Sequence, residues 1–137
     1  MIFLDTNVLS EFMLRSPNPR VVVWLDRQPR MSIWTTSVTI FEIRFGLQTM
    51  AIGRRRALLN QRFEEFLLRI NQQIASFDAD AAQHAGDLMA SRKLQGRSRE
   101  LRDTMIAGIV LAHHAALATR NTSHFDDISE TLVDPWR

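Results

Sequence analysis

Cysteine is absent from this chain of 137 residues. Its absence excludes a disulfide framework and a thiolate metal site, and it suits a reducing compartment. Long apolar runs are absent as well, because the longest, residues 105–112, is far shorter than the roughly 20 residues that span a bilayer. The apolar residues at the N-terminus follow no basic region and are too few for a signal peptide. We therefore expect a soluble, cytoplasmic protein.

Lysine is nearly absent, since Lys93 is the only lysine among 17 basic residues. The others are arginines, and the sequence pI is about 10.3 although the formal net charge is only +2. Arginine carries a permanent charge on a planar fork that matches phosphate. An arginine-biased genome would give the same composition, so composition alone does not identify a nucleic-acid-binding protein.

Short apolar runs alternate with amphipathic segments along the whole chain, with no repeat, low-complexity tract or long linker between them. This alternation predicts an α/β fold around a parallel sheet, in a single domain spanning residues 1–137. Thr6 or Asn7 is the expected cap of the first helix, and Ser37 that of the third. We expect strands at residues 2–5, 31–34, 74–77, 117–120 and 132–133, and helices at about 7–14, 20–28, 38–50, 54–71, 79–94 and 103–115.

Asp5 lies where the first expected strand ends. In open parallel sheets, ligands bind beyond the carboxyl ends of the strands, near the point where the strand order reverses. An aspartate at a strand end is also a common helix cap. This single carboxylate therefore does not by itself indicate a functional site.

Glu42 lies within a run apolar enough to bury most of its helix. At about 100° per residue, its neighbours on the same face include Thr39 and Gly46, which leave room for a ligand beside the carboxylate. Isolated burial of a charged glutamate is costly, so Glu42 needs a partner or a cation. An ion pair with Arg44 is the simplest alternative, but Arg44 lies roughly 200° away around the helix.

Asp103 lies on the apolar face of the expected helix that begins with it, together with Ile106, Ala107 and Val110. The helix dipole stabilises a negative charge in the first turn. An aspartate at this place often faces solvent, but the apolar face favours an inward orientation. Three inward-facing carboxylates repel one another unless a cation joins them. Mg²⁺ or Mn²⁺, which prefer carboxylate oxygens, would neutralise them and could activate water against a phosphodiester.

Four motifs in order resemble those of the PIN-domain family, and the resemblance extends over essentially the whole chain. They are LDTNVLSE at residues 4–11, SVTIFE at 37–42 followed by Gly46, RDTMIAG at 102–108 and ATRNTSHF at 118–125. The sequence is most similar to the VapC and FitB type of toxin–antitoxin partner. The resemblance implies a Rossmann-like α/β/α sandwich with a short central parallel sheet. It also implies a Mg²⁺- or Mn²⁺-dependent ribonuclease toxin held inactive by a small antitoxin.

The resemblance also assigns the site. It makes Asp5, Glu42 and Asp103 the metal ligands and, with Asn121, the catalytic residues. Thr6 and Asn7 are expected to order the surroundings of the metal, and homodimers are expected to assemble further with the antitoxin. DNA would be bound only indirectly, through that antitoxin.

The fourth motif departs from the most acidic pattern of the family. Asn121 stands where some relatives have aspartate, and His124 stands where an acid often precedes the phenylalanine. Asp126 and Asp127 are alternative acids, although neither matches the usual position. Fewer carboxylates favour one firmly held ion over two.

Basic residues lead directly into Asp103. We expect them either to contact RNA phosphates or to form a solvated basic surface, and phosphate contacts give affinity without sequence information. His124 is a further possible RNA contact or an ordinary loop residue. The basic residues concerned are Arg92, Lys93, Arg97, Arg99 and Arg102.

The hypothesis from sequence is therefore hydrolysis of RNA phosphodiester bonds with Mg²⁺- or Mn²⁺-activated water. One alternative is a weakly catalytic or non-catalytic partner of a DNA-binding antitoxin in an autoregulatory complex. A more distant alternative is a phosphatase with Asp5 as nucleophile. Such a phosphatase usually has a second aspartate two residues later, where this chain has Asn7.

Overall fold

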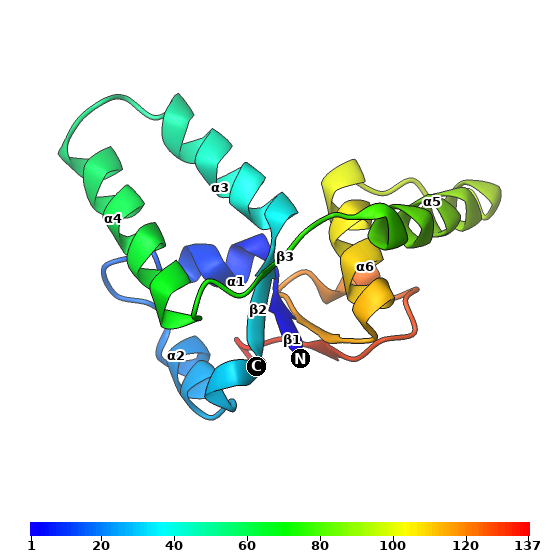
Figure 1. Cartoon of the computed structure of the whole chain (residues 1–137), viewed down its shortest axis with the longest axis horizontal. Helices are drawn as coiled ribbons and strands as arrows, with labels where there is room; N and C mark the ends of the chain where they lie inside the picture. Colours follow the sequence, from blue (N-terminus) through cyan, green and yellow to red (C-terminus); the bar gives the residue numbers. More distant parts are fainter.

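The computed structural model describes every residue from Met1 to Arg137. A five-stranded parallel sheet with strand order β3-β2-β1-β4-β5 forms its centre (Figure 1). The strands are β1 (Ile2–Leu4), β2 (Ile33–Thr36), β3 (Ile74–Ala75), β4 (Ala116–Ala118) and β5 (Leu132–Val133).

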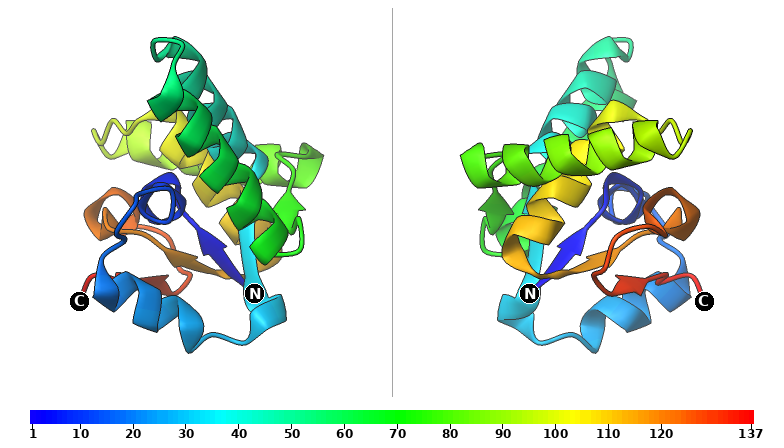
Figure 2. Two further views of the ribbon diagram at one scale, coloured as in Figure 1. Left: turned by 90° about the vertical axis from the view of Figure 1, so that its left-hand side faces the viewer. Right: turned by 90° about the vertical axis from the view of Figure 1, so that its right-hand side faces the viewer.

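Helices cover both faces of this sheet, which confirms the predicted α/β/α sandwich (Figure 2). Helices α1, α2 and α4 pack on one face, whereas α5 and α6 pack on the other. None of the helices combines the length and apolarity needed to cross a membrane. The α-helices are α1 (Thr6–Glu11), α2 (Pro19–Asp26), α3 (Ser37–Thr49), α4 (Arg54–Arg69), α5 (Ala79–Leu94) and α6 (Leu101–His113), and the 3₁₀ helices are η1 (Arg30–Ser32) and η2 (Thr122–Phe125).

The two central strands divide their side chains between two hydrophobic clusters. Successive side chains of a strand point to opposite faces of a sheet. Leu4 and Ala118 accordingly join the cluster beneath α1, α2 and α4, while Phe3 and Leu117 join the cluster beneath α6. All four side chains are fully buried, so β1 and β4 form the centre of the core.

The predicted caps of two helices were wrong. Asp5, rather than Thr6 or Asn7, caps α1, because its carboxylate accepts a hydrogen bond from the backbone N–H of Thr6. Thr36 rather than Ser37 caps α3. The hydroxyl of Ser37 instead accepts a hydrogen bond from the backbone N–H of Phe77, 40 residues away in sequence.

Some predicted ends of elements also differ from the observed ones. Helix α1 ends at Glu11, and β2 begins at Ile33 because the residues after Pro29 form η1. Helix α3 is less buried than its apolar sequence indicated, since Phe41 and Phe45 are 60% and 59% exposed. It projects away from the sheet beside α4 and buries only one side of its length (Figure 1).

Gly108 marks the closest approach of α5 and α6. A Cβ atom at this position would lie 2.5 Å from the carbonyl oxygen of Ala81 and 2.7 Å from Cβ of Ala85. We expect Gly108→Ala to lower the free energy of unfolding by about 1–3 kcal/mol, because the backbone of α5 cannot move aside without cost. A Cβ atom added to Gly86 in α5 would have nothing within 4 Å, so Gly86→Ala should stabilise by up to about 1 kcal/mol.

Urea denaturation of the two variants beside the wild type measures this difference. Equal effects of the two substitutions would contradict the packing argument.

Candidate functional site

The candidate site lies where the strand order reverses. Strands β2 and β3 follow on one side of β1, and β4 lies on its other side. Such a reversal opens a crevice beyond the carboxyl ends of the two neighbouring strands. Asp5 follows β1 and Thr119 follows β4, so both residues lie at this edge of the sheet.

Asp5 is held by hydrogen bonds on both carboxylate oxygens and is only 3% exposed. Its Oδ1 accepts from the backbone N–H of Thr6 at 2.8 Å. Its Oδ2 accepts from the hydroxyl of Thr119 at 2.7 Å and from the side-chain amide of Asn7 at 3.2 Å. The side-chain oxygen of Asn7 also accepts from the backbone N–H of Arg120, which ties the β1 end to the β4 end.

The electrostatic environment of Asp5 disfavours its charge. The pKa of Asp5 is raised from 3.8 to about 6, chiefly by burial and also by the nearby negative charges of Asp103 and Glu42, against the lowering effect of its hydrogen bonds from Thr119 and Thr6. The charged form of this carboxylate is therefore disfavoured in the metal-free protein. An added positive charge would relieve both the desolvation and the repulsion.

Glu42 lies on α3 and reaches toward α1. Its Oε1 accepts a hydrogen bond from the hydroxyl of Thr6 at 2.8 Å, and that hydroxyl also lies 3.0 Å from the hydroxyl of Thr39. Burial raises the pKa of Glu42, while Thr6 and Arg102 oppose the rise. The side chain is 21% exposed, so it is less buried than the sequence indicated. Arg44 bonds to Asn60 and not to Glu42, which agrees with its predicted position on a different side of the helix.

Asp103 lies in the first turn of α6, as predicted, with its side chain 22% exposed. Its Oδ2 lies 3.1 Å from Nδ1 of His124 in η2. Glu100 caps α6 by accepting from the backbone N–H of Asp103 at 3.1 Å. His124, predicted as an RNA contact or loop residue, therefore lies against one of the three acids.

The three acids are electrostatic neighbours but do not form a preassembled metal cage. No group of three or more His, Asp or Glu side chains is arranged as a set of metal ligands. Glu42 is bonded to Thr6, and Asp103 to His124. The donor set nevertheless fits a hard divalent cation, because it consists of carboxylate oxygens and the buried Asp5 is destabilised by like charges.

The fourth motif places a threonine, rather than Asn121, against the acids. Asn121 is exposed, and its backbone N–H donates to the Thr119 hydroxyl at 3.0 Å. Thr119 was not among the site residues predicted from sequence, although its hydroxyl is the nearest hydrogen-bond donor to the Asp5 carboxylate. The expected strand at residues 117–120 included Thr119, whereas β4 ends at Ala118, so the wrong strand end concealed its place at the edge of the sheet.

Arg102 is the basic residue nearest to the acids. Its Nε lies 3.0 Å from Glu100 and 3.9 Å from Oε2 of Glu42, and its side chain is 42% exposed. The hydrogen bonds from Arg102 and from the Asp103 backbone lower the pKa of Glu100 against the opposing effect of burial.

The other arginines before Asp103 face different partners. Arg97 and Arg99 lie 3.9 Å and 3.3 Å from the exposed Asp126. Both predictions for Arg92, an RNA contact or a solvated surface residue, were wrong, since it is 2% exposed and pairs with Asp127 at 2.7 Å. Neither alternative acid of the fourth motif is therefore bonded to the candidate site.

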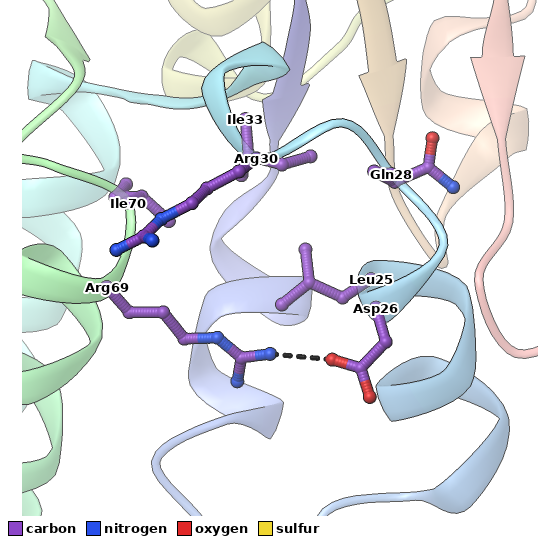
Figure 3. A pocket seen from close by; sticks show the side chains of 7 residues that line it. All are labelled: Leu25, Asp26, Gln28, Arg30, Ile33, Arg69 and Ile70. Carbon is purple, nitrogen blue, oxygen red and sulfur yellow. Dashed lines mark hydrogen bonds and ion pairs between the residues drawn. The ribbon is translucent and has the colours of Figure 1, made fainter.

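A separate pocket of about 290 Å³ lies between α2, η1 and α4 (Figure 3). The Arg69–Asp26 ion pair, 2.8 Å long, spans it, and Arg30 flanks it. It contains none of the predicted site residues.

Comparison with known proteins gives an independent result. The PIN-domain family profile matches residues 2–130. The chain is 37% identical to VapC ribonuclease Y4jK of Sinorhizobium fredii, over 99% of this chain and 98% of the relative. It is 31% identical to toxin FitB of Neisseria gonorrhoeae, over 99% of both chains. Among solved structures, FitAB bound to an IR36 DNA fragment superposes with a TM-score of 0.90 at 31% identity, over 100% of this chain and 96% of that chain.

Proposed function

The chain belongs to the PIN-domain family, and we propose that it is a metal-dependent ribonuclease toxin of a toxin–antitoxin pair, acting as one domain. The observation that carries this proposal is the nearly fully buried Asp5 at the strand-order reversal, whose charge is disfavoured by burial and also by the neighbouring Asp103 and Glu42. The names of the relatives, a VapC ribonuclease and a toxin, support the same activity.

Asp5, Glu42 and Asp103 would hold Mg²⁺ or Mn²⁺, which would neutralise charge on the phosphodiester and activate water. The chain's own residues prepare this site. Thr119 and Asn7 orient the Asp5 carboxylate, and Thr6 orients Glu42. Asn121, exposed and bonded through its backbone N–H to Thr119, is proposed to hydrogen-bond water or substrate there.

Arg102 is proposed to contact an RNA phosphate, because it is partly exposed beside Glu42. Arg97 and Arg99 would contribute further phosphate contacts along the same approach, and His124 a contact beside Asp103. Water as the nucleophile, in place of the ribose 2′-OH, leaves a 5′-phosphate and a 3′-hydroxyl on the products.

An antitoxin and a second copy of the chain are the proposed protein partners. The FitAB structure supports the first, because FitB is a relative of this chain. An apolar groove of about 630 Å³, lined by Phe41, Phe45, Leu101 and Met105 among others, supports a protein contact between α3 and α6. Exposed apolar surfaces of this kind often mark protein–protein interfaces.

Growth on expression separates this function from the alternative of a non-catalytic partner in a DNA-bound complex. The exposed Asn121 in the place of an acid favours that alternative, as does the FitAB–DNA structure. We expect the wild type alone to arrest growth and Glu42→Gln to lose this toxicity, because an amide cannot supply the missing negative charge. Glu64→Gln, an exposed position on α4, is the matched control and should remain toxic.

Co-expression with the product of a short neighbouring gene should restore growth of the wild type. If Glu42→Gln, produced at the same level, arrests growth as strongly as the wild type, catalysis is not the basis of toxicity.

A further inference from the structure

Arg92, in the last turn of α5, is the largest fully buried side chain of the protein. Its Nε and one terminal nitrogen bond to the two carboxylate oxygens of Asp127 at 2.7 Å and 2.8 Å. The same terminal nitrogen lies 3.3 Å from the carbonyl oxygen of His124. The other terminal nitrogen donates to the hydroxyl of Thr104 at 2.9 Å. The Arg92 guanidinium thus connects α5 with α6, through Thr104, and with η2 and the residues after it, through His124 and Asp127.

Two of these segments, α6 and η2, position Asp103. Thr104 is its neighbour in the first turn of α6, and the imidazole of His124 contacts its carboxylate at 3.1 Å. Arg92 bonds to the Thr104 side chain and to the His124 carbonyl oxygen. It therefore contacts the residue that follows Asp103 in α6 and the residue whose imidazole lies against the Asp103 carboxylate, without touching the carboxylate itself.

Stability alone is a weak reason for this arrangement. A buried ion pair loses most of its Coulomb energy to desolvation, and well-packed apolar residues often replace one without loss of stability. The bidentate fork adds a fixed geometry that apolar side chains cannot reproduce. The hydrogen bond from Arg92 also lowers the pKa of Asp127, so the pair stays ionised at neutral pH.

We propose that Arg92 is a positioning residue of the acidic site: it fixes α6 and η2 relative to each other so that His124 stays against Asp103. The role in catalysis rests on the proposed ribonuclease function. The structural part, the placement of His124, does not.

The test compares the double variant Arg92→Met/Asp127→Leu with the wild type. The double variant removes the fork without leaving an unpaired buried charge. Its matched control is Arg69→Met/Asp26→Leu, which removes an exposed ion pair of 2.8 Å far from the acids. Thermal unfolding first establishes that each variant is folded.

Four readouts follow for the folded variants. In the double variant we expect kcat for RNA cleavage to fall about 10- to 100-fold, KM to change less than about threefold, and the affinity for Mn²⁺ alone to fall about tenfold or more. The imidazole NMR signals of His124 in metal-free protein should shift as well. They are identified among four histidines by their loss in His124→Gln. The control pair should change none of these.

Arg92→Lys serves if the double variant does not fold. Lysine keeps a charge beside Asp127 but cannot bond to Asp127, Thr104 and His124 together. Wild-type His124 signals in a folded variant would overturn the proposal, as would unchanged kcat and Mn²⁺ affinity. A wild type that neither binds Mn²⁺ nor cleaves RNA would instead refute the proposed function, and the His124 signals would still decide the role of Arg92.

Discussion

Asp5→Asn is expected to reduce RNA cleavage by at least about 100-fold, because even residues that only orient metal ligands typically contribute 10- to 100-fold. Asparagine keeps the shape of the side chain and can still accept from the Thr6 backbone. It loses the negative charge that the proposed cation needs. The measurement is the rate of cleavage of an end-labelled RNA with Mg²⁺ or Mn²⁺, and with EDTA.

Asp87→Asn is the matched control, since Asp87 is exposed on α5. Its activity should equal that of the wild type, and EDTA should abolish both. Asp103→Asn should reduce the rate of cleavage about as much as Asp5→Asn. The double variant should cleave RNA only a little more slowly than either, because the two acids act as one unit and the loss of one already removes most of their joint effect. Cleavage that survives in EDTA or in Asp5→Asn would refute the assignment of these acids.

The architecture was predictable from sequence because it depends on local patterns. Short apolar runs separated by amphipathic segments bury a sheet between helices, and this arrangement does not depend on the exact residues at which each helix or strand ends. The ends themselves depend on distant partners. Ser37 was an acceptable cap by type, but its hydroxyl is used by the backbone of Phe77, and the neighbouring Thr36 caps α3 instead.

The candidate acids were also proposed from sequence, Glu42 and Asp103 because they lie on apolar helix faces, and Asp5 because its place at a strand end agrees with the family resemblance. Their partners were not identifiable, since Thr119 meets Asp5 across 114 residues of sequence and His124 meets Asp103 across 21. Arg92 was misassigned for the same reason. An arginine near other charged residues is usually solvated, and its burial depends on Asp127, 35 residues later.

Metal-free wild type is expected to lose stability relative to Asp5→Asn as the pH rises. Burial raises the pKa of Asp5 from 3.8 to about 6, so the folded protein keeps a proton that the unfolded chain has already lost. The stabilising effect of this protonation is complete below pH 3.8 and is lost as the pH passes 6. A difference of about two pH units corresponds to about 3 kcal/mol, because folded molecules bind more protons than unfolded ones across this window.

Urea unfolding in EDTA between about pH 4 and pH 8 measures this effect. Asparagine does not titrate, so the difference between the wild type and Asp5→Asn isolates Asp5 from the other groups. That difference should fall by about 3 kcal/mol over the range. The curve of Asp87→Asn should stay parallel to the wild-type curve. Parallel curves for Asp5→Asn and the wild type would show that Asp5 has an ordinary pKa.

Excess Mn²⁺ at pH 7.5 should reverse the order of stability. A cation that binds only the folded protein stabilises it by about 4.1 kcal/mol at a concentration of 1,000 times Kd, which exceeds the loss of about 3 kcal/mol expected for the metal-free wild type at this pH. The relief of desolvation and repulsion at Asp5 is part of this binding free energy, and Asp5→Asn, which lacks the carboxylate, should bind the cation more weakly and gain less. The wild type should therefore change from the less stable to the more stable of the two. The reversal is expected only if the Asp5 carboxylate destabilises the metal-free protein and is a ligand of the cation when Mn²⁺ is present.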